Sequence, residues 1–178
     1  GPGMRLQGAL ELPSMMALAA TRSPDLAYRA GRAVAEEALD LGFHVNFAPV
    51  ADINSNPANP IINIRSFGED RELVADMAEA YARGMQDAGL IATAKHFPGH
   101  GDTDVDSHRR MPVVATPPAV WQRIDRPPFQ AAVDEGVCVV MTGHVWTPAL
   151  DPYEARPATL SPVVVRGWLR ERLGFDGV

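Results

Sequence analysis

Side chains suited to chemistry gather in one stretch of the sequence, KHFPGHGDTDVDSH at residues 95–108. It holds three of the five histidines, three aspartates and the single lysine of the chain, Lys95. Closely spaced imidazole and carboxylate groups can bind a metal ion, or they can pair so that the carboxylate orients a histidine for acid–base chemistry near neutral pH. Lysine offers a compact ammonium that the abundant arginines do not replace at a tight site. This stretch is therefore the first candidate site.

A calcium loop is one kind of metal site that the spacing of the aspartates suggests. Asp102, Asp104 and Asp106 occupy positions one, three and five of such a loop. The pattern then fails, because Ser107 stands where the glycine is expected and Val113 where the bidentate glutamate belongs. The sequence therefore excludes an EF-hand.

Two other interpretations of the stretch stay open at this point. His96, His100, Asp102 and His108 could form the site of a zinc-dependent hydrolase. Alternatively, Asp106 and His108 could form a pair in which the carboxylate orients the imidazole and raises its basicity, so that the histidine acts as a general acid and base.

Further polar residues lie near two other segments that are expected to form buried strands, residues 44–50 and 137–145. Asp52 and Asn54 come after residues 44–50, with Arg65 further along the same loop. His144 comes at the end of residues 137–145. Each has a structural interpretation as well. Arg65 could form a surface ion pair with an acidic residue of RSFGED, and His144 could be a buried, hydrogen-bonded histidine.

Hydrophobic periodicity predicts helices and strands in alternation. Ser23 is suited to an N-cap and Pro24 to the first turn of a helix. Helices are expected over residues 14–41, 69–87, within 117–135 and at about 161–173, and buried strands over 44–50, 90–97 and 137–145, with 174–178 leading into a fourth strand.

Strands that are apolar throughout and alternate with helices indicate a parallel α/β architecture. Two forms are available, a doubly wound sheet and a (β/α)8 barrel, and the chain holds about three strand–helix units against the ~250 residues of a complete barrel. Both forms bind ligands at the carboxyl ends of their strands, where the polar residues above are expected. Neither Gly-rich phosphate-loop pattern follows any strand, which argues against a nucleotide site.

Composition excludes several partners. The net charge of −6 argues against a nucleic-acid binder and a polybasic membrane-surface protein. No run of ~18 apolar residues is present to span a membrane. The one cysteine, Cys138, cannot form a disulfide within the chain.

Four segments resemble the family 3 glycoside hydrolases, and most closely their β-N-acetylglucosaminidase branch, which acts on peptidoglycan fragments. The likeness extends over nearly the whole chain from residue 12. The segments are KHFPGHGDTDVDSH (95–108), NFAPVADINSNPANPIINIRSFGED (46–70), VMTGHVWTPALD (140–151) and LSPVVVRGWLRERLGFDGV (160–178).

The resemblance implies a role for each candidate residue. His108 and Asp106 match the histidine–aspartate pair that replaces the usual carboxylic acid/base in this branch. Lys95, His96 and Arg65 match residues that bind the sugar. The implied reaction is the retaining hydrolysis of terminal, non-reducing N-acetyl-β-D-glucosamine, with a broad β-glucosidase as the alternative within the family. No cofactor or metal is implied, and the expected partner is a small carbohydrate, either a GlcNAc-containing muropeptide or a disaccharide.

The resemblance also implies a (β/α)8 TIM-type barrel, of which residues 1–178 would form the central part. On this expectation the first strands, and the strand that carries the carboxylate nucleophile of a retaining enzyme, are not in the chain. We therefore expect the 178-residue polypeptide on its own to be inactive.

Overall fold

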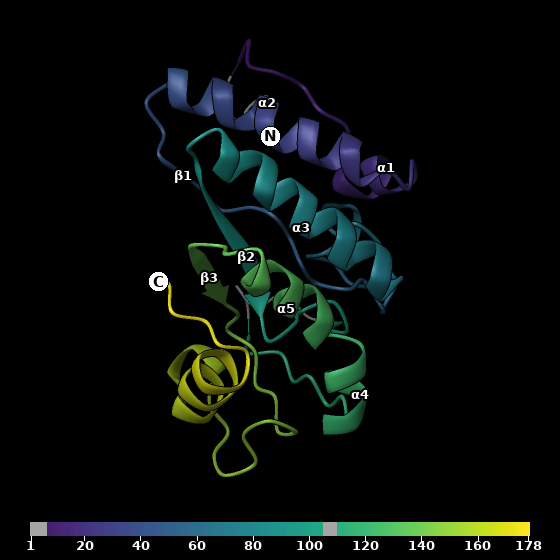
Figure 1. Cartoon of the computed structure of the whole chain (residues 1–178). Helices are drawn as coiled ribbons and strands as arrows, with labels where there is room; N and C mark the ends of the chain where they lie inside the picture. The colour runs from purple at the N-terminus through teal and green to yellow at the C-terminus, as the bar shows by residue number, and fades with distance from the viewer. Residues whose placement is uncertain (1–6, 105–109) are drawn as a thin grey trace.

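The computed structural model of the chain describes residues 7–104 and 110–178. A three-stranded sheet lies at its centre (Figure 1), with the strands in the order of the chain and β2 in the middle. Both pairs are parallel, and Val45 lies opposite Ile91 while Thr93 lies opposite Val139. The strands are β1 (Val45–Asn46), β2 (Ile91–Phe97) and β3 (Val139–Thr142). The predicted parallel α/β architecture is confirmed.

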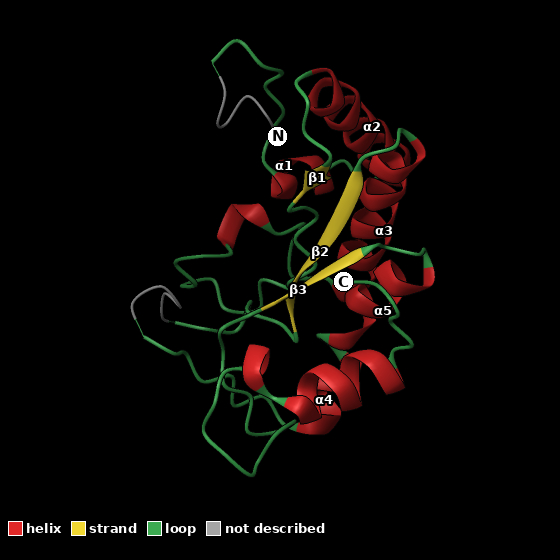
Figure 2. Ribbon diagram, turned by 90° about the vertical axis from the view of Figure 1, so that its left-hand side faces the viewer, coloured by secondary structure: helices red, strands yellow, loops and turns green. Residues whose placement is uncertain are grey.

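Helices α2, α3 and α5 lie on one side of the strands, and much of the loop chain gathers on the other (Figure 2). Among the described residues, no helix is long and apolar enough to cross a membrane. The helices are α1 (Met15–Ala19), α2 (Pro24–Asp40), α3 (Arg71–Asp87), α4 (Pro118–Arg123) and α5 (Arg126–Asp134), together with the short 3-10 helices η2 (Asn63–Arg65) and η3 (Ala158–Leu160) and the π-helix η4 (Val163–Arg172).

Helices α2 and α3 pack at a distance that only glycine permits. A Cβ at Gly31 of α2 would overlap the carbonyl oxygen of Tyr81, and one at Gly84 of α3 would overlap the carbonyl oxygen of Tyr28. The two glycines therefore bring the helix backbones together, and the buried face of α3 lies between α2 and the sheet.

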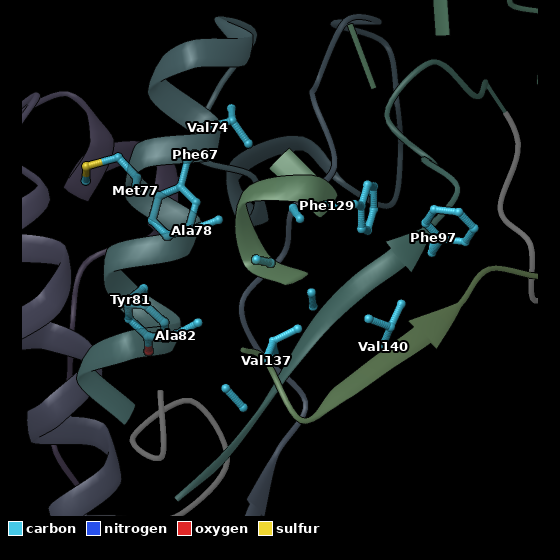
Figure 3. Close-up of a cluster of buried hydrophobic side chains, with 14 of the residues drawn as sticks. Phe67, Val74, Met77, Ala78, Tyr81, Ala82, Phe97, Phe129, Val137 and Val140 are labelled. Carbon is cyan, nitrogen blue, oxygen red and sulfur yellow. The ribbon is translucent and has the colours of Figure 1, made fainter. Parts of the chain in front are cut away.

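The core between the helices and the sheet is built from the apolar faces of these elements (Figure 3). Phe97 at the end of β2 packs edge-on against Phe129 of α5 and Trp121 of α4, with ring centroids 5.3 and 6.3 Å apart. Trp121 also donates from Nε1 to the carbonyl oxygen of Pro98 at 2.7 Å. This aromatic cluster of Phe97, Trp121 and Phe129 thus holds in place the chain that leaves β2 toward the candidate site.

Two predicted helices are each divided in the structure. Residues 14–41 form α1 and α2, separated by a turn in which Arg22 has a φ of 51°, and Ser23 caps α2 as predicted, its Oγ accepting from the N–H of Leu26. Residues 117–135 form α4 and α5. The second begins with Arg126-Pro127-Pro128, and prolines cannot continue a preceding helix because they have no N–H.

The first predicted strand is shorter and less buried than expected. Only Val45 and Asn46 of residues 44–50 form strand β1, and Phe47 is exposed. Pro49 has no N–H to give to a ladder, although its carbonyl oxygen accepts from the N–H of Lys95. At the other end of the chain, Val178 exchanges backbone hydrogen bonds with the segment of β3, as the expected lead-in to a strand would.

Candidate active site

The carboxyl end of the central strand β2 carries Lys95 and His96, both half-buried. The chain that follows β1 runs beside them, because the N–H of Ala51 donates to the carbonyl oxygen of Lys95 at 2.7 Å. This backbone contact brings Asp52, the next residue, alongside His96. Two loops distant in sequence, after β1 and after β2, therefore meet at the end of the central strand.

Asp52 is the acceptor around which the two loops are organised. Its side chain is fully buried, and Oδ2 lies 2.7 Å from Nδ1 of His96 and accepts from the backbone N–H of the same residue at 3.1 Å. Oδ1 accepts from the backbone N–H of His100 at 2.8 Å. Burial opposes the charged form, but the charge of His96 and these hydrogen bonds outweigh it and lower the pKa of the Asp52 carboxyl.

His100 has a structural role in the turn after β2. The ring is buried, with Nδ1 2.7 Å from the hydroxyl of Thr103, and Nε2 has no hydrogen-bond partner among the described residues. Burial is the largest cause that lowers the pKa of His100, and the charges of His96 and Arg65 lower it further. A neutral, enclosed His100 is therefore a poor candidate for contact with a substrate.

Asn59, in the loop after β1, ties that loop to the turn after β2. Its amide Nδ2 donates to the carbonyl oxygens of His100 and Gly101 at 2.8 and 3.1 Å, and Oδ1 accepts from the N–H groups of Ile61 and Ile62. The loops touch backbone to backbone, since a Cβ at Gly101 would overlap the carbonyl of Ile53. The position of the turn after β2 is thus set by the loop after β1.

Asp125 is a buried carboxyl group beneath the same turn. It is 6% exposed, and its side chain makes no capping hydrogen bond at the start of α5. Burial, with smaller contributions from the negative charges of Asp52 and Asp102, raises the pKa of Asp125 to about 7. It lines a cavity of about 410 Å³ that Glu69 and Asp102 also line.

The structure differs from two expectations, that Arg65 forms a surface ion pair and that His144 is buried. Arg65 donates from Nη1 to the carbonyl oxygen of Ile61 at 2.9 Å, and no ion pair joins it to an acidic residue of RSFGED in the part of the chain that the structure describes. His144 is exposed rather than buried, but it is hydrogen-bonded, with Nδ1 2.8 Å from the hydroxyl of Thr159. Arg65 lies in η2, within the loop after β1, and its charge contributes to the lowered pKa of His100.

Asp106 and His108, the expected acid–base pair, lie outside the described residues. Within residues 7–104 and 110–178, no group of three His, Cys, Asp or Glu side chains is arranged to hold a metal ion. The described members of the zinc alternative are instead engaged elsewhere: His96 with Asp52, His100 with Thr103, and Asp102 with the hydroxyl of Thr116 at 3.2 Å.

Three residues of the site have roles that the sequence did not reveal. Asp52 appears in the sequence only as a polar residue after a strand, and Asn59 and Asp125 carry no local signal. Their contacts with the turn after β2 span 26 to 48 residues of sequence: Asp52 and His100 are 48 residues apart, and Asn59 and Gly101 are 42 apart. Only the position of Asp52 directly after a predicted strand was available as a signal.

The sheet is parallel, and a histidine, a lysine and a buried carboxylate lie together at the end of its central strand. The sequence contains no phosphate-loop pattern. These features define an α/β protein with a candidate active site at the carboxyl ends of its strands. Residues 1–178 match the family described as glycosyl hydrolase family 3 N terminal domain. The chain belongs to glycosyl hydrolase family 3.

Three proteins illustrate what the chain is similar to. A protein of Cellulomonas fimi named beta-N-acetylglucosaminidase/beta-glucosidase is 39% identical over 186 residues, covering 100% of this chain and 33% of that protein. The solved structure of a family 3 beta-N-acetylglucosaminidase from Paenibacillus superposes with a TM-score of 0.95 at 48% identity, covering 98% of this chain and 33% of that one. NagZ from Neisseria gonorrhoeae, in complex with N-trifluoroacetyl-D-glucosamine, gives 0.89 at 32% identity, covering 97% of this chain and 52% of that one.

The chain thus spans about a third to a half of the length of these relatives. Activity, substrate and mechanism are properties of the whole protein.

Proposed function

We propose that the full-length protein hydrolyses terminal, non-reducing N-acetyl-β-D-glucosamine from peptidoglycan-derived fragments and retains the anomeric configuration. The observation that carries this proposal is the His96–Asp52 contact at the carboxyl end of β2, beside Lys95. The name of the Paenibacillus relative, and the N-trifluoroacetyl-D-glucosamine in complex with the Neisseria relative, support the sugar.

Lys95, His96 and Arg65 bind the sugar in this proposal. The ammonium of Lys95 donates to hydroxyl oxygens from the end of a rigid strand, and a hydrogen bond from a charged group contributes about 1.5–3 kcal/mol. Nε2 of His96 meets a further hydroxyl, since Nδ1 is taken by Asp52. The three strands would be consecutive strands of a (β/α)8 barrel, whose active site lies at this face.

Asp106 and His108 form the acid–base pair in this proposal. A histidine with a pKa near the unperturbed value of ~6.5 can give a proton to the leaving oxygen and recover it from water in the second step. In the first step a carboxylate attacks the anomeric carbon and forms a glycosyl-enzyme, and in the second step water displaces that carboxylate. Asp52 and Asn59 fix the position of the turn after β2, and in the sequence this turn leads into the segment that carries Asp106 and His108.

The proposed reaction is tested by the rates of the full-length enzyme on two chromogenic substrates, an N-acetyl-β-glucosaminide and a β-glucoside. We expect kcat/KM to favour the N-acetyl substrate. Equal or greater kcat/KM on the glucoside would instead assign the protein as the broad β-glucosidase, an activity that the name of the Cellulomonas relative also contains.

The acid–base pair is tested by His108→Ala with a series of leaving groups. Loss of a general acid costs about 10²–10⁴ in rate, and the loss should be greatest for leaving groups of high pKa because these need the proton most. Asp106→Asn should show the same trend to a smaller degree. A loss that is equal for all leaving groups would remove His108 from this role.

A further inference from the structure

Asp52 makes more contacts than the one with the His96 ring that supports the proposed function. Both carboxylate oxygens are occupied: Oδ2 by the ring and the backbone N–H of His96, and Oδ1 by the backbone N–H of His100. We propose that Asp52 is a positioning residue, which holds His96 in the Nδ1–H tautomer so that Nε2 alone is presented to the sugar. The kinetic part of this inference rests on the proposed function.

The tautomer follows from the pattern of donors. The two backbone N–H groups can only donate, so both oxygens of Asp52 act as acceptors. Oδ2 already accepts from the His96 backbone when the ring nitrogen Nδ1 meets it at 2.7 Å, a distance short enough for a charge-assisted bond. Nδ1 is therefore the donor in this contact, and the proton of a neutral His96 ring is placed on Nδ1.

The other ring nitrogen of His96 is left available. Within the described residues the His96 ring makes its hydrogen bond through Nδ1, and its side chain is 15% exposed while that of Asp52 is fully buried. In the neutral ring Nε2 accepts a hydrogen bond from a sugar hydroxyl, and in the protonated ring it donates one. In either state Asp52 fixes which atom faces the substrate and how the ring is turned.

Asp52 contacts two histidines, but it orients the ring of His96 only. The same carboxylate contacts His100 only through the backbone, and the His100 ring is paired with Thr103 and buried. The two rings lie edge to face with centroids 5.9 Å apart. Asp52 thus fixes the turn through one histidine and the orientation of an accessible imidazole through the other.

The tautomer is tested directly by long-range ¹H–¹⁵N correlation spectra of histidine-labelled full-length protein, recorded under conditions in which the His96 ring is neutral. His96→Gln identifies the His96 signals. We expect the Nδ1–H pattern for His96 in the wild type. In Asp52→Ala, where no side-chain acceptor is left at position 52, we expect the Nε2–H form that a free imidazole prefers. Asp52→Asn keeps the size of the side chain and one acceptor oxygen, and it serves if the alanine variant does not fold. In Asp52→Asn the Nε2–H fraction of His96 should rise above that of the wild type.

An Nε2–H pattern for His96 in the wild type would overturn the inference, as would a tautomer ratio that neither variant changes. This readout needs no substrate. It therefore stands or fails separately from the proposed function.

The kinetic readout separates positioning from a general loss of structure. If Asp52 orients a sugar-binding group, Asp52→Asn should raise KM and lower kcat/KM by about 10- to 100-fold, the range found when a carboxylate that orients a metal-bound histidine is removed. Partial unfolding would instead lower kcat at an unchanged KM. Asp76→Asn makes the same chemical change on the outer side of α3 and should leave both constants as they are. An unchanged KM in Asp52→Asn would count against positioning.

Discussion

Oδ2 of Asp52 lies 2.7 Å from Nδ1 of His96, 44 residues later in the chain. This contact links the loop after β1 to the end of β2, and with Lys95 and Arg65 it makes the strand end the centre of the candidate site. The same carboxylate also has a structural role, because its other oxygen holds the turn at His100. In the proposed function, sugar recognition and loop position are therefore coupled through one buried carboxylate.

We predict that Asn59→Ala lowers the free energy of unfolding by about 2–4 kcal/mol, since buried N–H and C=O groups on two loops lose their partners at a cost of about 1–3 kcal/mol each. Equilibrium denaturation measures the change. Asn56→Ala, in the same loop, loses only a hydrogen bond from the N–H of Ala58 near the surface and should cost about 1 kcal/mol or less. Equal losses in the two variants would show that Asn59 does not tie the loops together.

The unfolding free energy should depend on the protonation of Asp125. Because burial raises its pKa to about 7, unfolding releases the proton at any pH between the unfolded value near 4 and 7, and stability falls as pH rises through this window. Asp125→Asn removes the penalty. We expect this variant to match the wild type near pH 4 and to exceed it at pH 8 by up to about 4 kcal/mol, at ~1.4 kcal/mol per pKa unit.

Denaturation at a series of pH values measures this effect of Asp125. Asp134→Asn, exposed in the same helix, controls for the loss of one negative charge. A difference between Asp125→Asn and the wild type that is the same at pH 4 and pH 8 would contradict the account.

Replacement of glycine by alanine should affect stability differently at two helical positions, Gly84 and Gly167. Gly84→Ala places a methyl group against the carbonyl of Tyr28, so α2 and α3 must separate, and we expect a loss of at least about 2 kcal/mol in stability. At Gly167, in η4, nothing lies within 4 Å of the added carbon, so Gly167→Ala should be neutral or stabilise by about 0.5–1 kcal/mol. Thermal denaturation compares the two, and a Gly84→Ala variant as stable as the wild type would rule out the close crossing.

Metal removal should leave the activity unchanged. The proposed mechanism takes its proton from His108, and in the structure His96, His100 and Asp102 are hydrogen-bonded to Asp52, Thr103 and Thr116. We expect enzyme dialysed against a chelator to retain its kcat/KM. A loss of activity that zinc restores would favour the zinc-dependent hydrolase over the acid–base pair.

Local sequence signals predicted the elements that hold the site better than the site itself. Residues 90–97 gave β2 almost residue for residue, because an apolar run follows the helix end at Gly89. Residues 44–50 gave only a two-residue strand, because Pro49 and the loop contacts of Ala51 divide that segment between sheet and loop. Lys95 and His96 were found because they lie at the end of a recognisable strand.

The remaining contacts depend on chain segments that meet only after folding. The Asp52 carboxylate and the Asn59 amide bind the turn after β2 from the loop after β1, and Asp125, at the start of α5, lies against Gly99 of the same turn. No spacing rule within a helix or a strand relates such positions. Their functions could be recognised only once the distances were known.

The most direct test of the account is the effect of Lys95 on hydrolysis of a chromogenic N-acetyl-β-glucosaminide by the full-length enzyme. We predict that Lys95→Ala lowers kcat/KM by about 10- to 100-fold, as expected for the loss of charged hydrogen bonds to the sugar. Lys95→Arg should not restore it, because the forked guanidinium differs in shape from the ammonium. Arg29→Ala, on the outer side of α2, serves as the control for loss of a positive charge. A folded Lys95→Ala enzyme with the kcat/KM of the wild type would contradict the assignment of this strand end as the sugar site.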